Sequence, residues 1–279
     1  MAQQVGTNRP LRGWKTFGAV VVLGAAIALA ACDAISPKET GCVAPTVAPA
    51  GEVAPADRAP GGGGLRVIEK GFTQLGDDRF MVSVGGVVEN ASAKVAYRVP
   101  ITFRVLDADQ KSVIAEEYEK RFRLEIPVIL PGQKVPVGNF GVVRSDGLHR
   151  GAKVAALHID LGPGQWLSFD DRFAQISTGY QGIERSAERQ ESAVISYSVN
   201  SRYCRSLVLY GISMVFRGAD RSIVGGTFQF GGPPSVCRAG QTVTSTDTGS
   251  SVPLTIDEAL TEVRLYCDFE RSPTGYPTT

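Results

Sequence analysis

Strict alternation of apolar and polar residues is the feature that most constrains the fold of this chain. In the segment 95–105 every second residue is apolar, namely Val95, Tyr97, Val99, Ile101, Phe103 and Val105. A period of two is typical of a half-buried β-strand, whereas an amphipathic helix repeats every three to four residues. Further short strands are expected at 80–88, 112–115, 135–143 and 154–161, between turns rich in Pro, Gly, Asn and Asp. This succession of strands predicts an all-β chain built as an antiparallel β-sandwich.

The same order of signals recurs about 110 residues further along the chain. Asn90 is matched by Asn200, and the pair Gly132-Gln133 is matched by Gly240-Gln241. The segment 208–216 repeats the alternation of 95–105. The repeat predicts two tandem sandwiches, at residues 66–163 and 164–272, followed by a short tail at 273–279. Each sandwich is expected to fold as a separate unit because each has its own strands and turns.

The first copy resembles the FxLYD-type domains, which are small immunoglobulin-like modules of exported and lipid-anchored prokaryotic proteins. The resemblance is carried, in order, by Gly85-Gly86, Asn90, the run from Phe103 to Asp107, and the loop Leu130-Pro131-Gly132-Gln133. The second copy is degenerate, with Met214 to Gly218 where the named motif should lie. The resemblance implies a seven-stranded immunoglobulin-like sandwich with a recognition or spacing role, and it brings no catalytic residues.

The residues of this motif are predicted to be structural: Asn90, Phe103, Val105, Leu106, Asp107, Pro131 and Gly132. Phe103 and Val105 are expected to fill the core, Asp107 to bond the backbone of the hairpin turn, and Pro131-Gly132 to supply a bend. Pro100 lies inside a predicted strand, which places it at a sheet edge or a bulge. There it would guard against edge pairing or mark an edge that faces a partner.

The N-terminus has the layout of a bacterial lipoprotein signal. Three basic residues without an acidic neighbour precede an apolar run at 17–31, which ends in Leu29-Ala30-Ala31-Cys32. The run is shorter than the roughly 20 residues of a spanning helix. The resemblance of this ending to a lipobox implies a signal peptide at 1–31, cleavage before Cys32, and a diacylglyceryl group on the Cys32 sulfur. The Pro-, Ala- and Gly-rich stretch 32–65 is expected to be a flexible tether.

Cleavage would remove three positive charges and leave a nearly neutral protein, which gives no electrostatic reason to expect nucleic acid as a partner. It would also leave four cysteines outside the cytoplasm, where disulfides persist. Strand parity favours a bridge from Cys204 to Cys237, with Cys42 then paired to Cys267 or free. A bridge from Cys204 to Cys267 across the two sheets is the alternative. Reduction is expected to weaken the second domain far more than the first.

Residues that carry catalysis or bind metal are sparse. The chain has two histidines, His149 and His158, and no cysteine pair with zinc-finger spacing, nucleotide-binding loop or nucleophile elbow. We therefore expect no enzyme activity, no cofactor and no metal. The predicted function is a lipid-anchored, extracytoplasmic envelope protein that recognises, assembles or spaces a protein partner. The alternative is a solute-binding or accessory subunit of an envelope enzyme or transporter, which a cleft lined by aromatic residues such as Trp166 or Tyr180 would favour.

Overall fold

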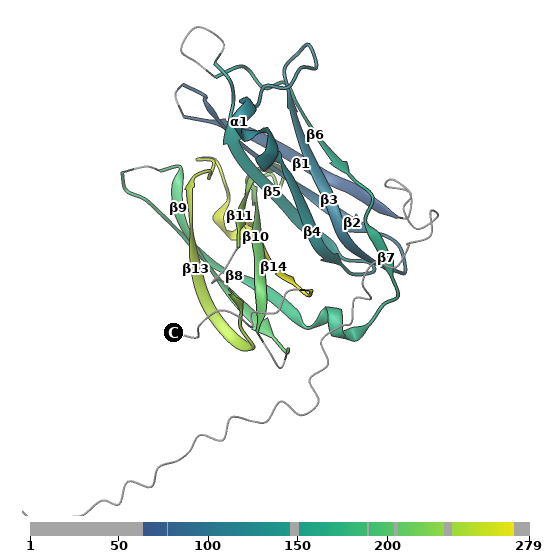
Figure 1. Ribbon diagram of the computed structural model, residues 1–279. Coiled ribbons are helices and arrows are strands. Elements are labelled where there is room, and N and C mark those ends of the chain that lie inside the picture. The colour runs from purple at the N-terminus through teal and green to yellow at the C-terminus, as the bar shows by residue number, and fades with distance from the viewer. Residues whose placement is uncertain are drawn as a thin grey trace, which may run out of the picture. The chain divides into compact units, whose positions relative to one another are not determined.

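The computed structural model describes residues 64–76, 78–145, 151–188, 190–203, 206–231 and 236–270. The predicted signal peptide, Cys32, Cys42, the tail at 273–279 and all but the end of the predicted tether lie outside these ranges. In the described part of the chain, four antiparallel sheets form two sandwich-like bodies, with one α-helix of four residues (Figure 1). The all-β prediction and the two tandem sandwiches are confirmed.

The first body pairs a sheet of order β1-β2-β5 with a sheet of order β4-β3-β6, to which β7 adds on β3. Its strands are β1 (Leu65–Leu75), β2 (Met81–Asn90), β3 (Val95–Leu106), β4 (Arg123–Ile129), β5 (Lys134–Val142), β6 (Ala156–Leu161) and β7 (Gln165–Leu167). The short helices α1 (Glu116–Glu119) and η2 (Lys120–Phe122) lead into β4. β3 alternates between buried and more exposed residues over most of its length, as the sequence predicts.

The second body repeats this arrangement, with a sheet of order β8-β9-β13 and a sheet in which β10 lies between β11 and β14. Its strands are β8 (Ile176–Arg185), β9 (Ser192–Ser201), β10 (Leu207–Arg217), β11 (Ile223–Phe230), β12 (Val236–Cys237), β13 (Gly240–Ser250) and β14 (Glu262–Asp268). The short helices η3 (Asp171–Ala174) and η4 (Glu258–Leu260) precede β8 and β14. The strand order shows that β8, β9 and β13 correspond to β1, β2 and β5.

Matching turns show that the repeat extends to the backbone. Gln110 and Arg221 close equivalent hairpin turns with positive φ angles of 63° and 67°. Gly132 and Gly240 have φ angles of 69° and 88°, a region that favours glycine. The tandem repeat read from the sequence is therefore a repeat of structure.

The two inner sheets pack against each other through glycine. A Cβ atom added at Gly138 of β5 would lie 2.2 Å from the carbonyl oxygen of Met214, and one added at Gly85 would lie 2.3 Å from that of Gly225. The Ser83 hydroxyl accepts a hydrogen bond from the Gly226 N–H and donates one to the Gly226 carbonyl, both at 2.9 Å. The sheets approach so closely at these positions because glycine has no side chain, and beside them Val87, Val215 and Ile223 form a small buried apolar cluster.

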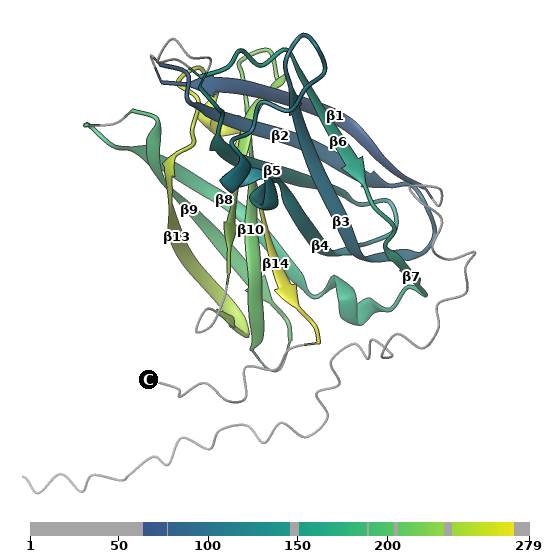
Figure 2. The ribbon, with the colours of Figure 1, turned by 45° about the horizontal axis from the view of Figure 1, so that its top comes forward.

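This contact produces four layers, in which β1-β2-β5 and β11-β10-β14 are the inner sheets. Figure 2 shows β3 and β6 on one side and β9 and β13 on the other, with β5, β10 and β14 between them. Burial on both faces explains why β2 is buried without interruption from Val82 to Val88 instead of alternating. Separate folding of 66–163 and 164–272 stays a prediction, and the buried interface now favours folding as one unit.

The expected role of Pro100 is wrong. β3 is a central strand that pairs with β4, β6 and β7, so Pro100 neither guards an edge nor faces a partner. It lies two residues after Arg98, which has a positive φ angle of 52°. The register of β3 with β4 runs without a shift past Pro100, and the register with β6 runs without a shift from Ile101 on. Pro100 therefore does not lie at a bulge either, and both halves of the prediction are wrong.

Candidate functional site

The residues of the FxLYD-like motif serve the fold. Asn90 is fully buried, and its side-chain amide donates to the carbonyls of Lys94 and Ile129 at 2.8 and 2.9 Å. Its Oδ1 accepts from the N–H and hydroxyl of Ser92. With its donors and acceptor used in this way, Asn90 fixes the end of β2 to the end of β4.

The other motif residues also have structural positions. The side chains of Phe103, Val105 and Leu106 are buried. Asp107 Oδ1 accepts the backbone N–H of Asp109 and Lys111 at 3.0 and 2.9 Å, which holds the hairpin turn. Pro131 and Gly132 form the β4–β5 turn, closed by a 3.0 Å hydrogen bond from the Gln133 N–H to the Leu130 carbonyl.

The cysteine pairing differs from the prediction. The structure joins Cys237 to Cys267, so the favoured bridge from Cys204 to Cys237 is wrong, and so are both bridges proposed for Cys267. After β11 the chain forms β12 beside the start of β10, opposite Leu207, while β14 brings Cys267 opposite Leu209. Both cysteines therefore belong to one sheet, and Cys42 and Cys204 lie outside the described residues.

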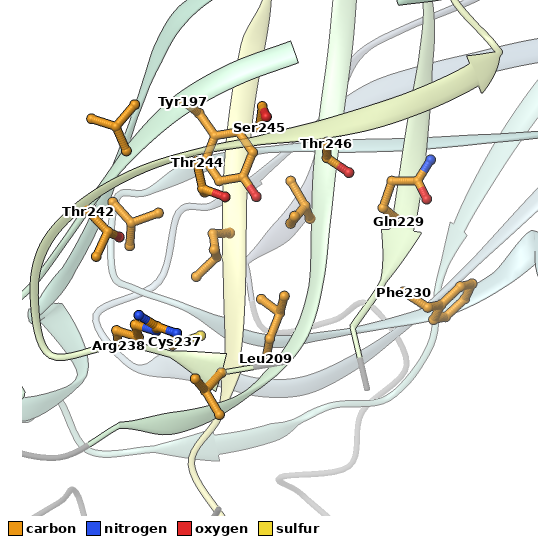
Figure 3. Close-up of a pocket in the computed structure, with 15 residues that line it drawn as sticks. Tyr197, Leu209, Gln229, Phe230, Cys237, Arg238, Thr242, Thr244, Ser245 and Thr246 are labelled. Atoms are coloured by element: carbon orange, nitrogen blue, oxygen red, sulfur yellow. The ribbon is translucent and has the colours of Figure 1, made fainter. Parts of the chain in front are cut away.

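A cleft of about 530 Å³ lies in the second body, between β13 and the β10–β11–β12 side of the opposite sheet. Its floor is apolar and includes Val199, Leu209, Ile212 and Leu265. Figure 3 shows Arg238, beside Cys237, and Phe230 at opposite ends of the cleft. A volume of this size is within the range of ligand-binding pockets, roughly 300–1,000 Å³.

Threonines form the wall that β13 contributes. Thr242 and Thr244 lie opposite Val199 and Tyr197 of β9 in the sheet, and directly opposed residues share a face. Thr246 continues this series, and Figure 3 shows these hydroxyls along the cleft. Val243, at an alternate position, is 70% exposed. Within the described residues, the hydroxyls of Thr242 and Thr246 make no hydrogen bond with another residue.

The cleft has a simple charge pattern. Arg238 is the one charged residue among its described lining residues, none of which is acidic. Tyr197 shares a hydrogen bond with Thr244, and burial raises the pKa of its phenol while that bond acts in the opposite direction. Tyr197 is therefore a neutral hydroxyl at physiological pH, and the cleft offers hydroxyls and one cation but no acid–base pair.

A second hollow of about 350 Å³ continues from the cleft toward the first body. Gln229 and Phe230 line both hollows, and Arg121, Asn139 and Phe140 line the second. Phe230 is 56% exposed and packs edge-on against Phe228 with ring centroids 4.8 Å apart. An exposed aromatic ring between two hollows provides apolar contact for an elongated ligand.

Neither Trp166 nor Tyr180 lines the cleft. The cleft is therefore not the one, lined by these aromatic residues, that would favour solute binding. Trp166 packs on the first core and Tyr180 on the second. His158 lies on β6 between buried Leu157 and Ile159, as parity predicts, and His149 lies outside the described residues. In the described ranges no group of three or more His, Cys, Asp or Glu residues is placed to bind a metal ion.

Comparisons with known proteins identify no relative: no protein-family model matches the sequence, and no curated protein matches it. Within the described ranges, every helix is too short or too polar to cross a bilayer. The cleft residues were not found by sequence reasoning. The one available signal was the alternation of threonine at 242, 244, 246 and 248, where a core-facing strand would have apolar residues.

Proposed function

We propose that the protein is a lipid-anchored, extracytoplasmic envelope protein, and that it recognises a protein partner through the cleft of its second sandwich. The single observation that carries the recognition role is the cleft itself. An open, hydroxyl-lined depression on an otherwise closed sandwich offers binding groups without a catalytic pair. The lipobox-like ending at Cys32 and the resemblance to FxLYD-type modules support the location.

The rigid union of the two bodies supports the same role. Because the inner sheets contact each other through backbone, the second body is held in one orientation on the first. The predicted tether at 32–65 would then present a single stiff unit to a partner at a distance from the membrane. A cleft on such a unit is preorganised, which reduces the entropy lost on binding.

Filling the cleft should remove partner binding in intact cells. Thr246→Trp places a large side chain in the cleft, whereas Val194→Trp places the same side chain on the outer face of β9, where Val194 is 41% exposed and does not line the cleft. After chemical crosslinking and capture of the full-length protein, we expect one protein species to be crosslinked to the wild type and Val194→Trp, and at least tenfold less to Thr246→Trp.

The predicted membrane anchoring can be tested in the same cells. Cys32→Ser should move the protein from the membrane fraction to the soluble one, because the acyl chains supply the anchor. A partner captured equally by both tryptophan variants would show that the cleft is not the recognition site. If Thr246→Trp instead lost a bound small molecule that the wild type carries, and no protein partner was captured, the solute-binding alternative would be supported.

A further inference from the structure

The two copies of the sandwich differ at the place where the cleft lies. In the first body Val88 of β2, which faces the core, pairs with Val135 of β5, and in the second Val199 of β9, which also faces the core, pairs with Thr242 of β13. The inward-facing positions of β5 include Val135 and Val137, both completely buried. The inward-facing positions of β13 are threonines that line an open cleft.

A segment of the chain closes this side of the first body. Phe122, 2% exposed, packs against Gly141 of β5 so closely that a Cβ atom added there would lie 2.4 Å from its ring. Asn139 Nδ2 donates a 2.5 Å hydrogen bond to the Arg121 carbonyl. In the first body, Asn139 of β5 thus binds the backbone of the covering segment, and the ring of Phe122 fills the space beside β5.

The second body has no such closure among its described residues. Where the first body forms α1, the second continues as strand β11 up to Phe230. Thr246, like Asn139, faces inward four residues beyond the paired Thr242 or Val135, and its hydroxyl has no partner within the described ranges. The cleft of the second body therefore has inward-facing polar side chains, as the first body has, but no segment of the described chain covers them.

The edge of β13 is suited to an extended ligand. In the described chain β13 pairs with β9 alone, so its other edge presents backbone N–H and C=O groups at the mouth of the cleft. Arg238 lies at one end of this edge, and none of the described lining residues carries a negative charge. Charge complementarity therefore favours a ligand that has a carboxylate at that end.

We propose that the cleft binds an extended peptide segment of a protein partner, which pairs with the free edge of β13, places an apolar side chain on the floor, and sets an acidic side chain beside Arg238. This inference rests on the proposed function and adds the chemistry of the partner. Strand addition supplies affinity through the backbone, while the floor and Arg238 supply specificity. The hydroxyls of Thr242 and Thr246 supply further hydrogen-bonding groups beside the peptide backbone.

Selection from a library of random ten-residue peptides on the full-length protein in detergent micelles tests the proposal. We expect the enriched peptides to alternate apolar residues with others and to carry an Asp or Glu at a fixed position. Arg238→Glu should weaken their binding at least tenfold and prefer versions with Lys at that position. Arg221→Glu is the matched control, because it makes the same charge change in the β10–β11 turn, at the far end of β11 from Phe230.

Several results would overturn the proposal. One is that the wild type enriches no peptide more strongly than Thr246→Trp does. Another is that the enriched peptides lack an acidic residue, and a third is that Arg238→Glu binds them as tightly as the wild type. Binding that rises severalfold when residues 271–279 are removed would identify the chain's own tail as the occupant. If the peptide results fail while crosslinking in cells still depends on Thr246, the recognition function stands and the acidic-peptide chemistry is wrong.

Discussion

Gly138→Val should destabilise the whole protein by about 3 kcal/mol or more, the largest effect that we expect from a single substitution. An added Cβ atom would lie 2.2 Å from the Met214 carbonyl oxygen and 2.5 Å from the Thr227 nitrogen. Both are backbone atoms of paired strands, so neither can turn away as a flexible side chain would. Relief requires the two inner sheets to separate, which also breaks the hydrogen bond from the Gly138 N–H to the Ser213 hydroxyl at 2.9 Å.

Gly182→Val in β8 is the matched control. A Cβ atom added at Gly182 has no neighbour within 4 Å, and valine suits a strand. Urea unfolding followed by circular dichroism should show a change of at most about 1 kcal/mol for this variant. Similar midpoints for the two variants would show that the glycine contact between the bodies does not hold in solution.

Removing the bridge with Cys237→Ala and Cys267→Ala should have the second large effect. The bridge closes a loop with a sequence separation of 30. The chain-entropy relation gives about 3.5 kcal/mol for such a loop. In a cooperative unit of this size the melting temperature would fall by roughly 10 °C.

The interface between the two bodies determines which part of the protein is destabilised when the disulfide is removed. The sequence alone suggests that the second sandwich weakens far more than the first, but a buried contact between inner sheets couples the two. Trp166 of β7 reports on the first body once Trp14 is replaced by Phe. We expect its fluorescence transition to fall together with the melting temperature measured by calorimetry. A Trp166 transition that stays in place while the second body melts earlier would show two independent domains.

Much of the fold could be predicted from local patterns. β3 has one face in the core of the first body, so its alternation survives in the sequence and identifies it as a strand. The hairpin turns and the glycines at 132 and 240 repeat because the same positive φ angles are needed in both bodies. These local signals were sufficient to predict two tandem sandwiches.

Features that depend on contacts between distant strands could not be predicted. β2 is buried on both faces, so its run of small and apolar residues gives no sign that a second body covers its outer face. Parity gave an inward face for Cys204, and the return strand was expected to bring Cys237 back to the same end. Neither signal showed that β14 brings Cys267 beside Cys237, and the predicted pairing was therefore wrong. The cleft arises from a difference between the two copies, which appears only when the sheet register shows that Thr242 and Val135 both face inward.

Photo-crosslinking in intact cells is the measurement that tests most directly whether the cleft binds a partner. A photoreactive phenylalanine derivative would replace Thr246, whose side chain lines the cleft, or Val194, which is exposed on the outer face of β9. We predict a discrete protein adduct from position 246 that exceeds the adduct from position 194 at least fivefold, and its loss when Arg238→Glu is added. Equal adducts from the two positions, or no protein adduct from position 246, would contradict the proposed role of the cleft.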